Sequence, residues 1–131
     1  MQQPHPTAFS QRWPVFAVLV RGPSMAPALR DGDCVLVWRS NVHSDQTRHR
    51  VHRGAVVVAR FRSRPDLLVV KRAVRPVDGG WWVEGDNPQV ADDSRRYGVA
   101  DVVGPVVLRY WPVRRLRLFR SGGRRLGARP E

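Results

Sequence analysis

The sequence has little cysteine, few acidic residues and no long apolar run. Its one cysteine, Cys34, cannot form a disulfide within the chain, so nothing indicates an oxidising compartment. No stretch approaches the roughly 20 apolar residues that span a bilayer. The first residues also lack the basic and apolar segments of a signal peptide. We therefore expect a cytoplasmic protein without a spanning helix.

The charge balance is strongly basic, because 23 Lys and Arg residues stand against 11 Asp and Glu residues in 131 positions. Such an excess can indicate binding to nucleic acid or to anionic lipid. The cations concentrate in the loop 39–53 and after position 108, however, and a basic terminal segment is more often a solvated extension than a specific site. We expect no specific nucleic-acid partner.

The length fits one domain with a modest core. Residues 1–12 are rich in Gln and Pro and have no hydrophobic periodicity, which predicts a flexible leader. The folded domain is expected over residues 13–112, followed by a basic C-terminal tail over residues 113–131.

Short apolar runs rich in β-branched residues recur between turn signals, and they predict strands at 15–20, 34–38, 55–61, 67–74, 81–84 and 102–111. No window of a dozen residues has helical spacing, so a mainly antiparallel β domain follows. Asp78, Gly79 and Gly80 predict a tight hairpin turn, because glycine supplies the positive φ that such turns require.

Ser24 and Lys71 are the residues that best fit a catalytic role, as a nucleophile and its base. A serine hydroxyl is a poor nucleophile that needs an adjacent base, and a lysine amine can be that base only if apolar burial lowers its pKa. Lys71 lies within the apolar strand predicted over 67–74, and Ser24 lies between two prolines in a constrained turn. Each residue alone would more often be structural than catalytic, so a basic binding module is the alternative.

Nothing in the sequence predicts a metal or a cofactor. His43, His49 and His52 fall in the basic loop 39–53, but they share no ligand spacing with Cys34, and the surrounding arginines would repel a cation. We predict a solvated loop.

Four segments, in order, resemble the conserved boxes of type I signal peptidases and their relatives; they cover residues 22–29, 31–37, 69–74 and 85–95. The first holds Ser24 directly before Met25. The third holds Lys71 followed by Arg72, and the last contains Gly-Asp-Asn followed by Asp-Ser-Arg. Four boxes with the right order and spacing are hard to obtain by accident.

The resemblance implies the mainly antiparallel β fold that signal peptidases share with SOS-repressor self-cleaving domains, and a Ser-Lys protease as the activity of residues 13–112. Ser24 would be the nucleophile and Lys71 the general base. The Ser24 backbone N–H would bind the oxyanion, and Gly22, Ser24 and Met25 together would form the oxyanion- and substrate-binding segment. Some signal peptidases have a hydroxyl at the position of Gly22, so any second donor here must come from the backbone.

Structural support of the site is expected from residues of the third and last boxes, namely Arg72, Asp86, Asp93, Ser94 and Arg95. In the family, the arginine beside the lysine pairs with the aspartate of Gly-Asp-Asn, which implies a pair between Arg72 and Asp86. Asp93 and Arg95 are expected to form a second clamp. Ala91 stands where many members have a serine near the lysine amine, so the orientation of Lys71 is an open question.

Within this group, the short chain and residues 67–73 and 80–88 are most similar to nickel-type superoxide dismutase maturation proteases, which remove an N-terminal extension. The partner implied is a precursor protein bound as an extended strand. A signal peptidase for exported precursors is one alternative, and a peptide-binding protein without activity is another. A self-cleaving repressor is less favoured, because only about a dozen residues precede the predicted core, too few for a DNA-binding domain.

The residues after Trp111 admit two interpretations. Leucines alternate with arginines, as expected for a final strand before a solvated basic tail. The same mixture of Trp, Leu, Phe and Arg also suits weak peripheral contact with an anionic membrane surface.

Overall fold

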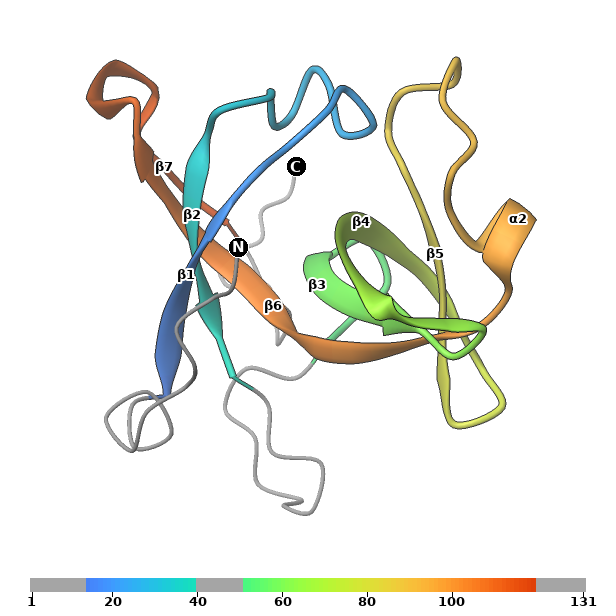
Figure 1. Ribbon diagram of the computed structural model, residues 1–131. Coiled ribbons are helices and arrows are strands. Elements are labelled where there is room, and N and C mark those ends of the chain that lie inside the picture. Colours follow the sequence, from blue (N-terminus) through green and yellow to red (C-terminus); the bar gives the residue numbers. More distant parts are fainter. Residues whose placement is uncertain (1–13, 40–50, 120–131) are drawn as a thin grey trace, which may run out of the picture.

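The long strand β6 (Ala100–Trp111) joins the two halves of the fold (Figure 1). The computed structural model describes residues 14–39 and 51–119. In the first half, β1 (Val15–Leu19) pairs with β2 (Cys34–Trp38), and β2 pairs with β6, all antiparallel. The short strand β7 (Arg117–Leu118) pairs with β6 as well.

The second half is built from the other part of β6 and from β3 (Val56–Phe61), β4 (Arg64–Val77) and β5 (Gly80–Glu84). β3 lies between β6 and β4, and β4 pairs with β5. One further antiparallel pairing, between Trp81 and Ala100, joins β5 to β6. These four strands therefore surround a single interior.

Two hydrophobic clusters form the core, and β3 contributes to both. Val56 and Val58 belong to the cluster of the first half, whereas Val57, Ala59 and Phe61 belong to that of the second. Successive side chains of a strand point to opposite faces, so β3 is buried on both sides. Its nearly continuous apolar run follows from this position.

The mainly antiparallel β architecture predicted from the sequence is confirmed, and apart from β4 the ends of the predicted strands agree with the observed ones to within about two residues. β4 is the largest departure: it extends at both ends beyond the predicted 67–74 and includes Pro65 and Pro76. The turn of Asp78 and Gly79 has positive φ at both residues and connects β4 to β5, as predicted.

Two short helices were not predicted. α2 (Ser94–Tyr97) begins after Asp93, whose side chain accepts a hydrogen bond from the Arg95 N–H. The 3-10 helix η1 (Val113–Arg115) and β7 occupy residues that were assigned to the tail, and β7 lies where one interpretation of the residues after Trp111 predicted a final strand. The predicted leader 1–12, His43, His49 and the end of the tail lie outside the described residues.

Candidate functional site

The fold brings Ser24 and Lys71 together although 47 positions separate them. Ser24 lies in the loop over residues 20–33 between β1 and β2, called here the Ser24 loop, and Lys71 lies in the middle of β4. A hydrogen bond joins Lys71 Nζ to Ser24 Oγ at 2.8 Å. This is the separation that direct proton transfer between the two atoms requires.

The surroundings of Lys71 favour a neutral amine. Lys71 is 4% exposed and pairs across the sheet with Val57, so its side chain lies on the face that holds the second hydrophobic cluster. Burial lowers the pKa of Lys71 below its ordinary value. The negative charges of Asp93 and Asp92 oppose this shift, and the positive charge of Arg95 adds to it.

The Ser24 loop is anchored by Met25, whose side chain is 1% exposed and belongs to the first hydrophobic cluster. Gly22 has φ +82°, and its N–H donates to Asp31 Oδ1 at 2.7 Å, so this N–H is not free to bind an oxyanion. Within residues 14–39 and 51–119, the N–H groups of Ser24 and Met25 donate to no partner. Of the three residues predicted for oxyanion or substrate binding, Ser24 and Met25 are therefore the ones whose N–H groups are available among the described residues.

A turn after β5 packs directly on Ser24, and this contact was not predicted. The Asn87 N–H donates to the Ser24 carbonyl oxygen at 2.9 Å, and Asn87 Nδ2 donates to the Pro23 carbonyl oxygen at 3.1 Å. At Gly85, an added Cβ would lie 2.6 Å from the Ser24 carbonyl oxygen. The Gly-Asp-Asn motif marks this turn in the sequence, but only the fold reveals which residue it touches.

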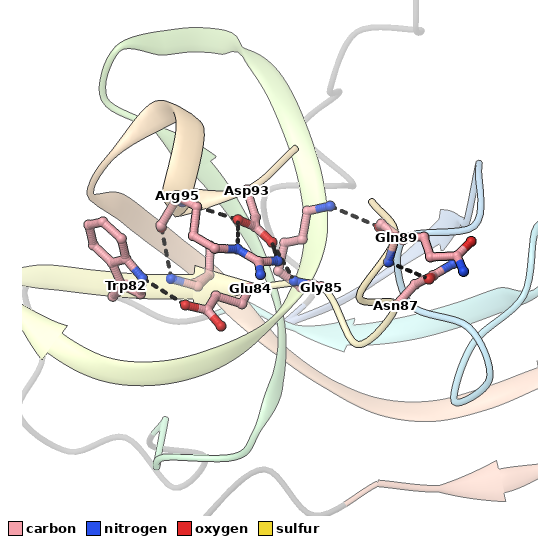
Figure 2. Close-up of polar contacts among 11 residues, drawn as sticks. Trp82, Glu84, Gly85, Asn87, Gln89, Asp93 and Arg95 are labelled. Atoms are coloured by element: carbon pink, nitrogen blue, oxygen red, sulfur yellow. Dashed lines mark hydrogen bonds and ion pairs between the residues drawn. The ribbon is translucent and has the colours of Figure 1, made fainter. Parts of the chain in front are cut away.

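The predicted clamp of Asp93 and Arg95 is present in the structure (Figure 2). Asp93 is fully buried and accepts from the N–H groups of Gly85 and Arg95 and from the Arg95 guanidinium. Burial acts to raise the pKa of Asp93, but these hydrogen bonds outweigh it and hold the pKa below its ordinary value. Asp93 is thereby kept ionised while it fixes the turn that begins at Gly85.

Ser94 and Ala91 do not orient the lysine amine. The buried Ser94 hydroxyl accepts from the Val83 N–H at 2.8 Å and so links α2 to β5. Ala91 is exposed and has no polar side-chain atom. Among the described residues, Ser24 Oγ is the hydrogen-bond partner of Lys71 Nζ.

Arg72 and Asp86 form the expected pair on the opposite face of β4 from Lys71. Two hydrogen bonds join the guanidinium to the carboxylate, at 2.8 Å and 2.6 Å, and Arg72 also donates to the Gly54 carbonyl oxygen. The hydrogen bonds that Arg72 donates to Asp86 raise the pKa of Arg72. The pair ties the strand that carries Lys71 to the turn that packs on Ser24.

A cleft of about 260 Å³ leads to Ser24 and Lys71. One wall is formed by residues 18–21, at the end of β1, and the other by residues 67–71 of β4. Within the described residues, β1 pairs with β2 only, and this part of β4 pairs with β3 only. Both walls are therefore strands with one unpaired edge.

No metal site accompanies these groups: residues 14–39 and 51–119 contain no cluster of three or more His, Cys, Asp or Glu side chains that could hold an ion. Of the three histidines considered for a metal, His52 is the one that the structure describes.

A buried lysine beside a constrained serine, on a mainly antiparallel β fold, is typical of a class of peptidases. The chain belongs to the Peptidase S24-like family, which matches residues 3–107. The protein is thus a peptidase of the group that includes signal peptidases and self-cleaving repressors.

Among individual proteins, the mitochondrial inner membrane protease subunit 1 of Xenopus tropicalis is 29% identical over 121 residues, which cover 73% of this chain and 69% of that protein. The human protein of the same name is 29% identical over 119 residues, with the same coverage. The mitochondrial ATP-independent inner membrane protease subunit 1a of Arabidopsis thaliana is 27% identical over 129 residues, which cover 79% of this chain and 74% of that protein. No helix among the described residues of this chain is long and apolar enough to cross a membrane.

Proposed function

We propose that the protein is a serine endopeptidase in which Ser24 is the nucleophile and Lys71 is the general base. The observation that carries this proposal is the 2.8 Å contact between Ser24 Oγ and the amine of a lysine that is only 4% exposed. A neutral amine can accept the serine proton, and burial is what lowers the pKa of Lys71 toward neutrality.

The reaction would be an acyl transfer in two steps. Lys71 Nζ takes the hydroxyl proton while Ser24 Oγ attacks the scissile carbonyl carbon, and the N–H groups of Ser24 and Met25 donate to the oxyanion. The protonated amine then gives its proton to the leaving nitrogen as the C–N bond breaks. In the second step, Lys71 takes a proton from water, the hydroxide attacks the acyl-enzyme, and Ser24 Oγ leaves with the proton from Lys71.

The cleft supports a substrate that binds as an extended strand. Its walls are the unpaired edges of β1 and β4, which can pair with the backbone of an added strand on either side. Backbone pairing would supply affinity, and the apolar side chains of the walls would select small or apolar substrate residues. We propose that the enzyme removes an N-terminal segment from a precursor protein.

Two kinds of precursor protein are candidates for the substrate. Residues 67–73 and 80–88 favour the precursor of a nickel-type superoxide dismutase, whereas the matched relatives are named as inner membrane proteases, which favours a precursor that is exported or sorted to a membrane. Incubating the purified enzyme with each precursor and sequencing the new N-terminus by mass spectrometry would distinguish them. A Ser24→Ala variant is the control for contaminating proteases.

The pH dependence tests the assignment of Lys71. Because the neutral amine is the base, kcat/KM should rise with pH and level off above the lowered pKa of Lys71. Lys71 is the only lysine in the chain, so protein labelled with [15N]lysine has a single side-chain amine resonance, whose titration gives this pKa directly. The two midpoints should agree. A rate that stays flat while the resonance titrates would show that Lys71 is not the base.

We also propose that the protein is cytoplasmic and makes weak, reversible contact with an anionic membrane surface. Four large apolar side chains within eight residues are 55–79% exposed: Trp111, Val113, Leu116 and Leu118. Arg114 and Arg117 are exposed among them, whereas Arg115 is held inward by Asp33. Apolar and cationic groups on one ordered segment suit the headgroup region of an anionic bilayer.

Sedimentation with vesicles tests this contact. The protein should pellet with anionic vesicles at low salt, much less at high salt, and not with neutral vesicles. Leu118→Ser, on the segment, should weaken binding, and Leu68→Ser, an exposed leucine of the cleft, should not. Protein that stays in the supernatant with anionic vesicles at low salt would instead be a freely soluble enzyme.

A further inference from the structure

Asn87 donates hydrogen bonds to the backbone carbonyl oxygens of Pro23 and Ser24. These carbonyls belong to the same two peptide groups as the Ser24 N–H and the Met25 N–H. The Asn87 N–H donates to the Ser24 carbonyl oxygen at 2.9 Å, and Asn87 Nδ2 donates to the Pro23 carbonyl oxygen at 3.1 Å. Its Oδ1 accepts from the Gln89 N–H at 3.0 Å (Figure 2). The last contact and the Pro23 contact together fix which way round the side-chain amide lies, with the nitrogen toward the Ser24 loop.

These contacts set the directions of two N–H groups that Asn87 does not touch. The C=O and N–H of a planar trans peptide point in opposite directions, and the Pro23–Ser24 and Ser24–Met25 bonds are both trans. Holding the Pro23 carbonyl therefore orients the Ser24 N–H, and holding the Ser24 carbonyl orients the Met25 N–H. Both N–H groups are free of partners among the described residues.

We propose that Asn87 is a positioning residue for the oxyanion-binding groups, and that its side-chain amide aims the Ser24 N–H at the developing oxyanion. The proposal rests on the proposed function, in which Ser24 is the nucleophile. The fold should survive loss of the amide, because the Pro23 carbonyl also accepts from the Ala26 N–H at 3.1 Å and the Asn87 backbone contact remains. The effect should therefore appear in the chemical step.

A purely structural role makes the opposite prediction for one substitution. If Asn87 only shapes its own turn through Oδ1 and the Gln89 N–H, aspartate is a good replacement, because its carboxylate keeps that acceptor. If the amide nitrogen aims the Pro23–Ser24 peptide, aspartate is worse than alanine, because it places a charged oxygen against the Pro23 carbonyl oxygen. Asn87→Asp and Asn87→Ala thus separate the two roles.

The experiment measures kcat and KM for a precursor peptide, with rates normalised to folded protein. We expect kcat to fall about 10-fold in Asn87→Ala and about 100-fold in Asn87→Asp, with KM nearly unchanged, because misaimed donors weaken the transition state more than the bound substrate. The pH midpoint of Asn87→Ala should match that of the unaltered protein. Gln89→Ala is the matched control, because its exposed side chain is lost while its N–H remains.

The outcomes separate this proposal from the function on which it rests. Asn87→Asp with unaltered kcat would overturn the positioning role, and so would a loss in either variant that appears only in KM or in the fraction of folded protein. Cleavage that persists in Ser24→Ala would instead overturn the assignment of the nucleophile.

Discussion

Lys71→Met should abolish cleavage and at the same time stabilise the folded protein at neutral pH. Loss of a general base typically costs about 10²–10⁴-fold in rate, and methionine offers Ser24 no proton acceptor. The stabilisation follows from burial: the fold holds the amine in an apolar setting that lowers its pKa, which means that the protonated lysine costs folding free energy. Methionine has a similar length and no charge to desolvate.

The size of this stabilisation depends on pH. Below the lowered pKa of Lys71, the folded protein carries the buried ammonium and the full cost is present. Between that pKa and the ordinary value of 10.5, the unfolded chain binds more protons than the folded one, so the stability of the unaltered protein rises with pH. The advantage of Lys71→Met should therefore shrink across this window.

Urea unfolding at several pH values, together with a cleavage assay, measures both effects. Lys71→Arg is the matched control: it should lose cleavage too, but it should be less stable than the unaltered protein, because a guanidinium cannot give up its charge. Cleavage by Lys71→Met at more than a tenth of the normal rate would contradict the role of Lys71 as base.

Gly85→Ala should reduce cleavage about 100-fold, because the added methyl group must displace Ser24. The new Cβ would lie 2.6 Å from the Ser24 carbonyl oxygen and 3.3 Å from its carbonyl carbon. Gly85 cannot easily move away, because its N–H is bonded to the buried Asp93. A nucleophile displaced by about 1 Å can lose about this factor, and overpacking should cost about 1–3 kcal/mol of stability.

Gly80→Ala separates the catalytic effect from the loss of stability. At Gly80 an added Cβ would lie 2.5 Å from the Ala100 carbonyl oxygen, a contact as close as that at Gly85 but with β6 in place of the Ser24 loop. Both variants should be destabilised in a denaturant titration, and only Gly85→Ala should lose rate per folded molecule. Equal losses of rate would mean that the effect is not local to Ser24.

Local patterns predicted the strands, because each depends on residues near one another in the sequence. The pairing of β5 with β6, and of β7 with β6, could not be predicted in the same way, since it depends on how the whole second half curves. The length of β4 was underestimated because proline usually lies outside a strand. Here Pro65 and Pro76 lie inside β4, each next to the last residue at its end.

The site, like the fold, has features that local sequence predicts and features that depend on contacts between distant segments. The residue types and their positions in four segments were enough to select Ser24 and Lys71, and Arg72 and Asp86 as a pair. The roles of Asn87 and Gly85 depend on a contact across more than 60 positions, which no local pattern encodes. Gly22 was grouped with the oxyanion donors, but its N–H is taken by Asp31, a side chain that sequence spacing alone does not place there.

The two cores that meet at β3 make activity depend on completed folding. The Ser24 loop is held by Met25 in the cluster of the first half, whereas Lys71 rises from β4 on the face of the second cluster. Neither half contains both reacting groups. Under the proposed mechanism, a chain in which only one half has folded would lack one of the two reacting groups and would therefore not cleave other polypeptides.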